Sequence, residues 1–465
     1  MAKWRGTVQF FCSEVPDTPM PILSWTHSES RGEATEWSVE LDNKTGSFAP
    51  GADPDDPENP WAGLLDCDPT TNDSPQEVKR YFWFEWTING VLTKSTRLLQ
   101  TEYQSDDNPK ESKVTIGGTD YTELWCDEDQ LMADVDAHIA VESSTAAIEA
   151  TATFCGAVVN FDESFVSWYV PMLHRVGTPL DWLRDLLEVR QGWFLHDDDG
   201  IMQIYAGGVD FSEAEVDHEI IERERLKVVR YRKSAQGIKN SGICQRVQEQ
   251  NDVTPDGGSR TTGLGETDFT FDPATMVVLD IKCWGGSAEV MQFYDADDNP
   301  LSLIVTGPHY FGTTPAVKCR FNLIPLTPGE AFEYEIHIRV TPPRPEEFGP
   351  FEEEFESSYT DSADSAAYKV KPYPEPFVKE CIDTQATGQD FIERKVREGL
   401  LNFAQVELSM LWDPTIRPGQ FLSVTCKQAA LDEHKLLVER RNGSGNSKEM
   451  VMTLECSRPR VVETP

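Results

Sequence analysis

Apolar and polar side chains alternate along several stretches of the first 130 residues, and this alternation predicts β-strands. Residues 37–41 alternate and run into a turn-forming segment, 42–46, that ends in glycine. Residues 81–88 form a dense aromatic strand followed by an Asn-Gly pair, the strongest short signal for a hairpin. Alternation returns at 113–116. Residues 50–60 contain four prolines and several acids, and therefore predict an exposed acidic loop.

The pattern changes to that of an amphipathic helix at Thr178. This residue is placed to cap the helix, a proline takes the first helical position, and Asp181 closes a capping box. Leucine and tryptophan side chains within 180–187 supply an apolar face, and Gly192 is expected to end the helix. Residues 193–205 then predict a strand, an acidic turn and a second strand.

The rest of the chain predicts strands separated by two irregular segments. Residues 254–265 are rich in turn-forming residues, and 342–376 are rich in proline and acid. Between them, strands recur at spacings of about 8 to 12 residues, which is the rhythm of a β-sandwich. These strands are expected at 276–283, 289–294, 301–305, 318–323 and 330–340. A strand is also expected at 226–231, a helix from about Asp390, closing strands at 405–411, 420–426, 435–440 and 448–456, and turns at 417–419 and 442–446.

Length and hydropathy limit the class of protein. A chain of 465 residues suggests about three domains. No apolar run approaches the roughly 18 residues of a membrane span, and no hydrophobic segment follows the positive charges at the N-terminus as it would in a signal peptide. We therefore expect a soluble product made in the cytoplasm.

Charge is the strongest compositional signal. The 80 acidic residues exceed the 41 Lys and Arg residues, which gives a net charge of −39. Such a surface repels phosphate, so sequence-reading nucleic-acid binding is disfavoured, because that affinity comes largely from Lys and Arg. The excess charge also favours solubility.

No motif predicts catalysis or metal binding. The ten cysteines are scattered without a C-x-x-C pair and are expected to be reduced core thiols. The acidic segments 196–200 and 295–300 lack the carboxylates of an EF-hand loop and are expected to be hairpin turns. His174 and His337 are dispersed, and no nucleotide-binding or G-x-S-x-G motif occurs. We therefore expect no catalytic, cofactor-binding or metal residues, no cofactor and no enzymatic activity.

Residues 24–50 resemble the opening barrel of phage tail hub proteins. In that family a strand ends in leucine, an acidic residue and asparagine, followed by a turn glycine, an aromatic residue and proline. The corresponding residues here are Leu41, Asp42, Asn43, Gly46, Phe48 and Pro50. Strands near 92–103 and 113–121, the capped helix at 178–189 and a terminal helix leading into the last strands follow in the family's order. The resemblance covers about 1–245 and 377–465, and an insertion at 254–345 departs from it.

The resemblance implies a mainly β (α+β), multidomain fold with two hub-type β-barrels, a small α/β domain and an inserted β-sandwich. The family includes hubs of contractile baseplates, siphophage tail tips and type VI secretion spikes. It builds homotrimers in which two barrels per chain form a pseudo-sixfold ring. The expected parts are an N-terminal barrel at 1–175, an α/β domain at 176–253 with strands feeding the second barrel, a sandwich at 254–345, an acidic linker at 346–376, and a helix with strands completing the second barrel at 377–465.

The function implied is that of a structural hub at the tail tip of a virion, assembled in the host cytoplasm. The ring would join the sixfold tail tube or distal tail ring to a threefold tip, fibre or spike. Its partners would be further copies of itself, a distal tail or tail tube protein, the tape measure protein, and a central fibre or spike. DNA would pass through the ring without specific binding.

Two alternative functions remain open. In the first, the sandwich presents aromatic side chains to a host-surface glycan, although packing in a core also explains them. The aromatic residues concerned are Trp284, Tyr294, Tyr310 and Phe311. In the second, a pair of carboxylates cleaves polysaccharide, a pair that would be defined by a spatial separation of about 5 to 10 Å. Glycan binding without turnover would favour the first, and release of product the second.

Overall fold

A computed structural model describes most of the chain. The described residues are 6–48, 59–62, 64–65, 78, 80–106, 112–126, 143–168, 170, 178–208, 211, 213–221, 226–234, 238–246, 261–295, 298–301, 303–306, 309–312, 316–341, 355–379, 382, 384–401, 403–429, 431–446 and 449–459. Most of the loop expected at 50–60, together with Cys67, Cys381 and His174, lies outside them.

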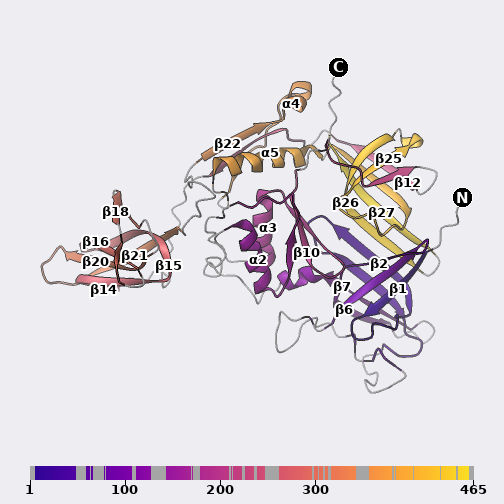
Figure 1. The fold of residues 1–465 in the computed structure, drawn as a ribbon, viewed down its shortest axis with the longest axis horizontal. Coiled ribbons are helices and arrows are strands. Elements are labelled where there is room, and N and C mark those ends of the chain that lie inside the picture. Colours follow the sequence, from indigo (N-terminus) through magenta and orange to yellow (C-terminus); the bar gives the residue numbers. More distant parts are fainter. Residues whose placement is uncertain are drawn as a thin grey trace.

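One 13-stranded sheet contains strands from both ends of the chain (Figure 1). Its main path runs β1-β4-β6-β7-β3-β2-β26-β27-β24-β12, and β5, β11 and β25 pair beside that path. The N-terminal strands are β1 (Gly6–Cys12), β2 (Ile22–Ser30), β3 (Glu36–Asp42), β4 (Phe82–Ile88), β5 (Val91–Lys94), β6 (Leu98–Asp106) and β7 (Lys113–Asp120). The others are β11 (His218–Ile221), β12 (Leu226–Lys233), β24 (Ala404–Leu411), β25 (Phe421–Cys426), β26 (Leu431–Asn446) and β27 (Met450–Arg458).

The two separate barrels expected from the resemblance are not present in the described residues. β2 pairs with β3 along one edge and with β26 along the other, so the N-terminal strands continue into the C-terminal ones. Because both edges of β2 are already paired, no edge of it is left to close a barrel of its own. The result is one open sheet.

The hydrophobic core follows this sheet across the join. Buried side chains of β1–β4, β6 and β7 and of β24–β27 form a single cluster. At its centre the ring of Trp412 lies 5.1 Å from that of Trp25 and 5.0 Å from that of Trp86. Aromatic pairs at this spacing add to the stability given by burial alone.

Local sequence signals for the N-terminal strands are confirmed. The aromatic strand is β4, and Asn89 and Gly90 form the predicted hairpin turn with φ of 51° and 88°. Positive φ at both central residues is what a two-residue hairpin of this kind requires.

The turn expected at 442–446 is wrong, because these residues belong to the long strand β26. Gly443 lies against Trp412, and a Cβ added there would stand 2.2 Å from the indole ring. A Cβ on Gly445 would stand 2.7 Å from the carbonyl oxygen of Glu449. These glycines therefore permit close approach within a sheet and do not mark a turn.

A small α/β layer packs beside the large sheet. It contains α2 (Ser144–Phe154), α3 (Pro179–Val189) and a sheet of order β8-β10-β9, built from β8 (Val159–Phe161), β9 (Trp193–His196) and β10 (Met202–Tyr205). The capping box of α3 is confirmed: Thr178 Oγ1 accepts from Asp181 N, and Asp181 Oδ2 accepts from Thr178 N, both at 3.3 Å. The short helix η1 (Tyr121–Trp125) leads from β7 into this layer.

The next layer pairs a long helix with three strands. The helix α5 (Gln385–Leu401) covers the sheet β22-β13-β23, which consists of β13 (Ser241–Arg246), β22 (Phe355–Thr360) and β23 (Phe377–Val378). The helix starts before the expected Asp390, because Thr384 Oγ1 accepts a hydrogen bond from Thr387 N and caps it. Gly388 lets the helix approach Phe355, whose ring would lie 2.4 Å from an added Cβ.

Part of the segment assigned to a linker is regular structure. Residues 355–360 form β22, and α4 (Ser362–Tyr368) follows. Asp361 caps α4 by accepting a hydrogen bond from Asp364 N at 2.7 Å, and Phe355 packs against the core of the α/β layer. Asp361 and the half-buried Phe355 therefore favour regular structure here, although the acidic and proline-rich composition predicted a linker.

The segment within the expected insertion forms an eight-stranded sheet whose strands pair with no other described strand. Its strands are β14 (Thr261–Gly263), β15 (Gly265–Trp284), β16 (Gly286–Tyr294), β17 (Pro300–Leu301), β18 (Leu303–Thr306), β19 (His309–Gly312), β20 (Ala316–Pro325) and β21 (Phe332–Thr341). The first part of β15 pairs with β20 and the second part with β21. The predicted mainly β, multidomain class is thus confirmed, while the exact domain limits stay predictions.

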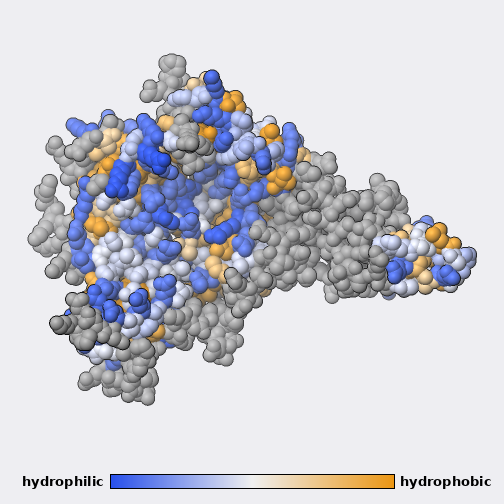
Figure 2. All heavy atoms as spheres, turned by 180° about the vertical axis from the view of Figure 1, so that it is seen from behind, coloured by the Kyte–Doolittle hydropathy of each residue, from blue (hydrophilic) through white to orange (hydrophobic). Residues whose placement is uncertain are grey.

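The surface of the main body is largely hydrophilic. Seen from behind, hydrophilic residues cover much of the body, and hydrophobic and hydrophilic residues are mixed at the far end of the insertion (Figure 2). Several large apolar side chains of the insertion are exposed; they are Leu264, Trp284, Met291, Ile324 and Leu326. Among the described residues, we find no helix with the length and apolar character needed to cross a membrane.

Candidate functional site

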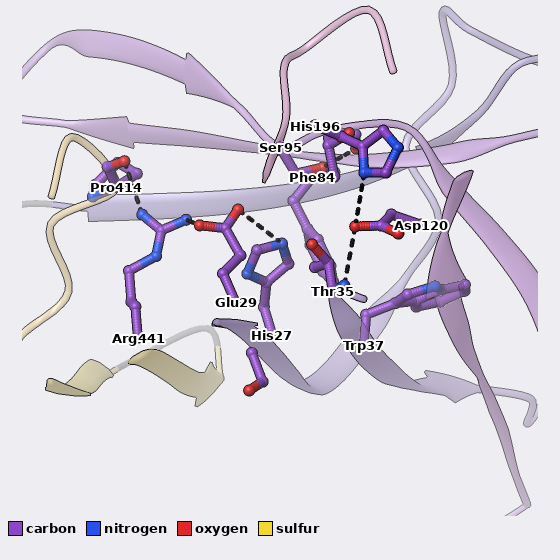
Figure 3. A network of polar contacts seen from close by, with 12 residues as sticks. His27, Glu29, Thr35, Trp37, Phe84, Ser95, Asp120, His196, Pro414 and Arg441 are labelled. Atoms are coloured by element: carbon purple, nitrogen blue, oxygen red, sulfur yellow. Dashed lines mark hydrogen bonds and ion pairs between the residues drawn. The ribbon is translucent and has the colours of Figure 1, made fainter. Parts of the chain in front are cut away.

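A buried network of charges lies where β2 meets β26 (Figure 3). Glu29 and Arg441 face each other in the strand register, and both side chains are almost fully buried. Arg441 Nη2 donates to Glu29 Oε2 at 2.7 Å. Its Nη1 donates to the carbonyl oxygens of Pro414 and Ile416 at 2.8 and 2.9 Å. The ion pair therefore links strands from opposite ends of the chain.

The strand pattern explains why Glu29 points inward. Trp25, His27 and Glu29 alternate along β2 and share its buried face. A carboxylate in this position needs a partner, because an unpaired buried charge is costly. Arg441 supplies it, and its guanidinium also lies 4.8 Å above the ring of Trp412.

Arg417 extends the network into the α/β layer. Its Nη2 lies 3.5 Å from Glu29 Oε1 and donates to the carbonyl oxygen of His196 at 2.7 Å. The loop that carries Arg417 turns at Gly419, whose φ is 87° and where an added Cβ would stand 2.1 Å from the ring of Trp193. This glycine satisfies both a backbone and a packing requirement.

A second pair joins β7 to β9. His196 Nδ1 lies 3.2 Å from Asp120 Oδ2, and both side chains are buried. Asp120 also accepts from the backbone N–H groups of Thr35 and Thr122, each at 2.9 Å. Burial alone would raise the pKa of Asp120, but His196 and these hydrogen bonds lower it below its usual value.

The surroundings of His27 and Glu29 lower the pKa of both side chains, but for different reasons. Burial is the main cause that lowers the pKa of His27 to about 4; Arg441 and Arg417 lower it further, and Glu29 opposes them. For Glu29, burial raises the pKa, but Arg441 and Arg417 outweigh it and lower the pKa to about 2. At neutral pH, His27 is therefore neutral and Glu29 is ionised.

This arrangement holds segments of the chain together. The side chains of Glu29, Asp120, His27 and His196 are all buried. What the network does is connect the N-terminal strands, the α/β layer and the C-terminal strands through charged hydrogen bonds.

The acidic segment at 196–200 is a hairpin turn, as predicted. In the segment 295–300, residues 296 and 297 lie outside the described residues, and the flanking strands β16 and β17 pair antiparallel. Asp197 Oδ1 accepts from the backbone N–H groups of Asp199 and Ile201. Asp295 Oδ1 accepts from Asn299 N at 2.8 Å. Within the described residues, no group of three or more His, Cys, Asp or Glu side chains is arranged to hold a metal ion.

The aromatic residues of the insertion do not form one described surface. Trp284 is 38% exposed, whereas the ring of Tyr294 lies under Lys318 Nζ at 4.7 Å. Tyr310 and Phe311 pair through their backbones with β15, and their side chains lie outside the described set, as does that of His337. The glycan hypothesis stays untested.

The buried network was not predicted from the sequence. The sequence feature that indicates it is the pair of polar residues, His27 and Glu29, on the inward face of an alternating strand. Eight cysteines are described, all as free thiols and most of them buried. Burial raises the pKa of Cys244 and Cys319 to about 12, so these thiols are protonated at neutral pH.

Fold and network together define a mainly β, multidomain protein in which both ends of the chain share one sheet. No protein-family model matches the chain, and no curated protein matches it. Solved structures do. The tail protein from Neisseria meningitidis MC58 superposes with a TM-score of 0.53 at 8% identity, covering 97% of this chain and 96% of that one.

Other similar structures are prophage tail proteins. The 43 kDa tail protein of prophage MuSo2 from Shewanella oneidensis has a TM-score of 0.49 at 11% identity, with 97% of this chain and 98% of that one covered. Tail protein gp18 from Listeria monocytogenes EGD-e has a TM-score of 0.44 at 9% identity, with 98% and 95% covered. Over nearly its whole length, this chain has the same fold as the Neisseria tail protein.

Proposed function

We propose that this chain is a structural hub of a phage-like tail and acts as a homotrimer. The observation that carries the proposal is the whole-length likeness to a tail protein, which includes the α/β layer and strands from both ends of the chain. The residue pattern at 41–50, where strand β3 ends, supports the same family. Closed cyclic symmetry is the usual solution for such a ring.

The proposed ring joins a sixfold tail tube or distal tail ring to a threefold tip, fibre or spike. Each copy contributes two groups of strands, one from the N-terminal and one from the C-terminal part of the chain. Three copies therefore present six such groups. The continuous sheet supports this role, because β2 and β26 hold the two groups in one orientation. The remaining proposed partner is the tape measure protein, and DNA passes through the ring without specific binding.

We propose a structural and not an enzymatic role. Among the described residues, the most strongly perturbed carboxylates, Glu29 and Asp120, are buried in ion pairs that join strands. Structural ion-pair networks shift pKa values as active sites do, so the perturbed pKa values alone do not indicate catalysis. The insertion is proposed to be a peripheral module.

Native mass spectrometry of the purified full chain tests the hub directly. We expect a complex of three times the 52.4 kDa chain mass, and electron microscopy of the same sample should show a threefold ring with a central opening. A variant that lacks residues 255–342 is the matched control, since a peripheral module can be removed without changing the stoichiometry. A stoichiometry incompatible with three, under conditions in which the chain is folded, would contradict the proposal.

A further inference from the structure

The strand at one end of the large sheet concentrates positive charge. β12 carries Lys227, Arg230, Arg232 and Lys233 and no carboxylate among its eight residues. Half of β12 is therefore cationic, whereas the whole chain has 41 Lys and Arg in 465 residues and a net charge of −39. A cationic strand is exceptional in so acidic a protein.

This strand also has a free edge. β12 ends the strand order and pairs with β24 along one side, and along the other side it has no strand partner in the part of the chain that the structure describes. The backbone N–H and C=O groups of such an edge are available to a strand of another chain.

The cations of β12 are exposed; Lys233 lies on the same side of the strand as Tyr231, and its Nζ is 5.2 Å from the centroid of that ring. Leu226, Val229 and Tyr231 pack against the core cluster, and a bulge follows Leu226. Lys227, Arg230, Arg232 and Lys233 are exposed. Two of them are neutralised: Lys227 Nζ lies 2.6 Å from Glu449 Oε1, and Arg230 Nη1 lies 3.0 Å from Glu407 Oε1. Among the described residues no ion pair is found for Arg232 or Lys233.

A cleft of about 710 Å³ lies beside this edge. Arg230, Tyr231 and Arg232 line it, together with residues of β24 and β27 and of the end of α5. The cleft also contains four carboxylates, those of Glu398, Glu407, Glu439 and Glu455. These carboxylates would repel an acidic segment, so the edge of β12, and not the cleft, is the surface that suits an acidic partner.

We propose that the β12 edge binds the acidic surface of a second copy of this chain. The inference rests on the proposed homotrimer and names one side of its interface. In a closed ring of three, each contact joins two different surfaces of the chain. Copies with a charge of −39 repel one another, and a cationic strand opposite carboxylates turns one contact into an attractive one.

Charge reversal at the two cations without ion pairs tests the interface. The variant Arg232→Glu with Lys233→Glu should weaken trimer assembly about tenfold or more, as expected for the loss of two surface attractions. Lys44→Glu with Lys94→Glu is the control for net charge, because both lysines are exposed and lie outside β12. Each of them faces a carboxylate, so thermal unfolding of both variants is measured first to show that they are folded. Analytical ultracentrifugation at physiological salt measures both.

A second measurement does not depend on a variant. Hydrogen exchange of the β12 amides should be slower in the wild-type trimer than in the diluted monomer, while the amides of β5 should be unchanged. Equal exchange of β12 in both states overturns the inference, as does an intact trimer of the Arg232→Glu, Lys233→Glu variant. In those cases the cations only protect a solvent-exposed edge.

Two further outcomes separate this inference from its alternatives. A wild-type chain that stays monomeric at all concentrations contradicts the homotrimer itself and the inference with it. A trimer that survives charge reversal contradicts the inference alone. A fluorescent 20-base-pair DNA duplex is the last probe, and binding by the wild type that Arg232→Glu with Lys233→Glu removes would make the edge a nucleic-acid site and overturn the inference.

Discussion

Replacing His27 by phenylalanine should remove much of the sensitivity of the large sheet to mild acid. His27 is buried among Phe84, Trp86 and Trp412, with ring centroids 5.8, 5.4 and 6.3 Å away. Neither ring nitrogen has a hydrogen-bond partner among the residues that the structure describes. A phenyl ring therefore loses no hydrogen bond and continues the aromatic cluster.

The magnitude follows from the pKa of His27, which is lowered from 6.5 to about 4. An imidazole with a lower pKa in the folded chain binds its proton more readily when unfolded, so stability falls as the pH drops from 6.5 to about 4. Between pH 7 and pH 5, this linkage costs about 2 kcal/mol. Glu29 hardly contributes there, because its stabilisation is lost only as the pH falls from 4.5 towards 2.

The assay is urea unfolding followed by tryptophan fluorescence, at pH 7 and at pH 5. The wild type should lose about 2 kcal/mol more than His27→Phe between the two pH values. Because all other titrating groups are the same in both proteins, their contributions cancel in this comparison. An equal loss in both proteins would show that His27 does not resist protonation in the folded chain, and would refute the reasoning.

Three other predictions concern packing, domain organisation and charge. Gly443→Ala should destabilise the chain by about 1–3 kcal/mol, because the new methyl group would overlap Trp412; Gly46→Ala, where nothing lies within 4 Å, reports backbone strain alone in the same thermal unfolding assay. Deleting residues 255–342 behind a short linker should leave the thermal unfolding of the remaining chain unchanged, and unfolding of the rest would make the insertion integral. In the assembled ring, carboxylates should outnumber Lys and Arg along the DNA channel, because screened repulsion over about 8 to 10 Å keeps a duplex mobile; a structure with a cationic lumen would refute this.

Elements with local chemical signals could be predicted from the sequence. The capping box at Thr178 and the hairpin at Asn89 each depend on a few adjacent residues, and both are present in the structure. The turn predicted at Gly443 was wrong for the opposite reason: glycine is required there by Trp412, which directly follows β24 and lies outside the local sequence pattern. In a sequence, a glycine is equally compatible with a turn and with the close approach of another side chain to the backbone.

The network was not predictable because its partners are distant in the sequence. Glu29 and Arg441 are 412 residues apart, and the sequence around either residue does not identify the other as its partner. The alternation along β2 indicates that Glu29 faces the core. Only the pairing of β2 with β26 shows that Arg441 is its partner. The same pairing decides between one continuous sheet and two barrels, which local periodicity leaves undetermined.

The pairing of β2 with β26 also sets an order of events during synthesis. At about 5–20 residues per second, the ribosome delivers β26 roughly 20 to 80 s after β2 has emerged. Throughout that interval β2 has one unsatisfied edge, and Glu29 has no arginine. Contacts of such long sequence separation form slowly. An unpaired strand edge is prone to aggregation, so we expect a truncated chain that stops before β26 to aggregate through the β2 edge.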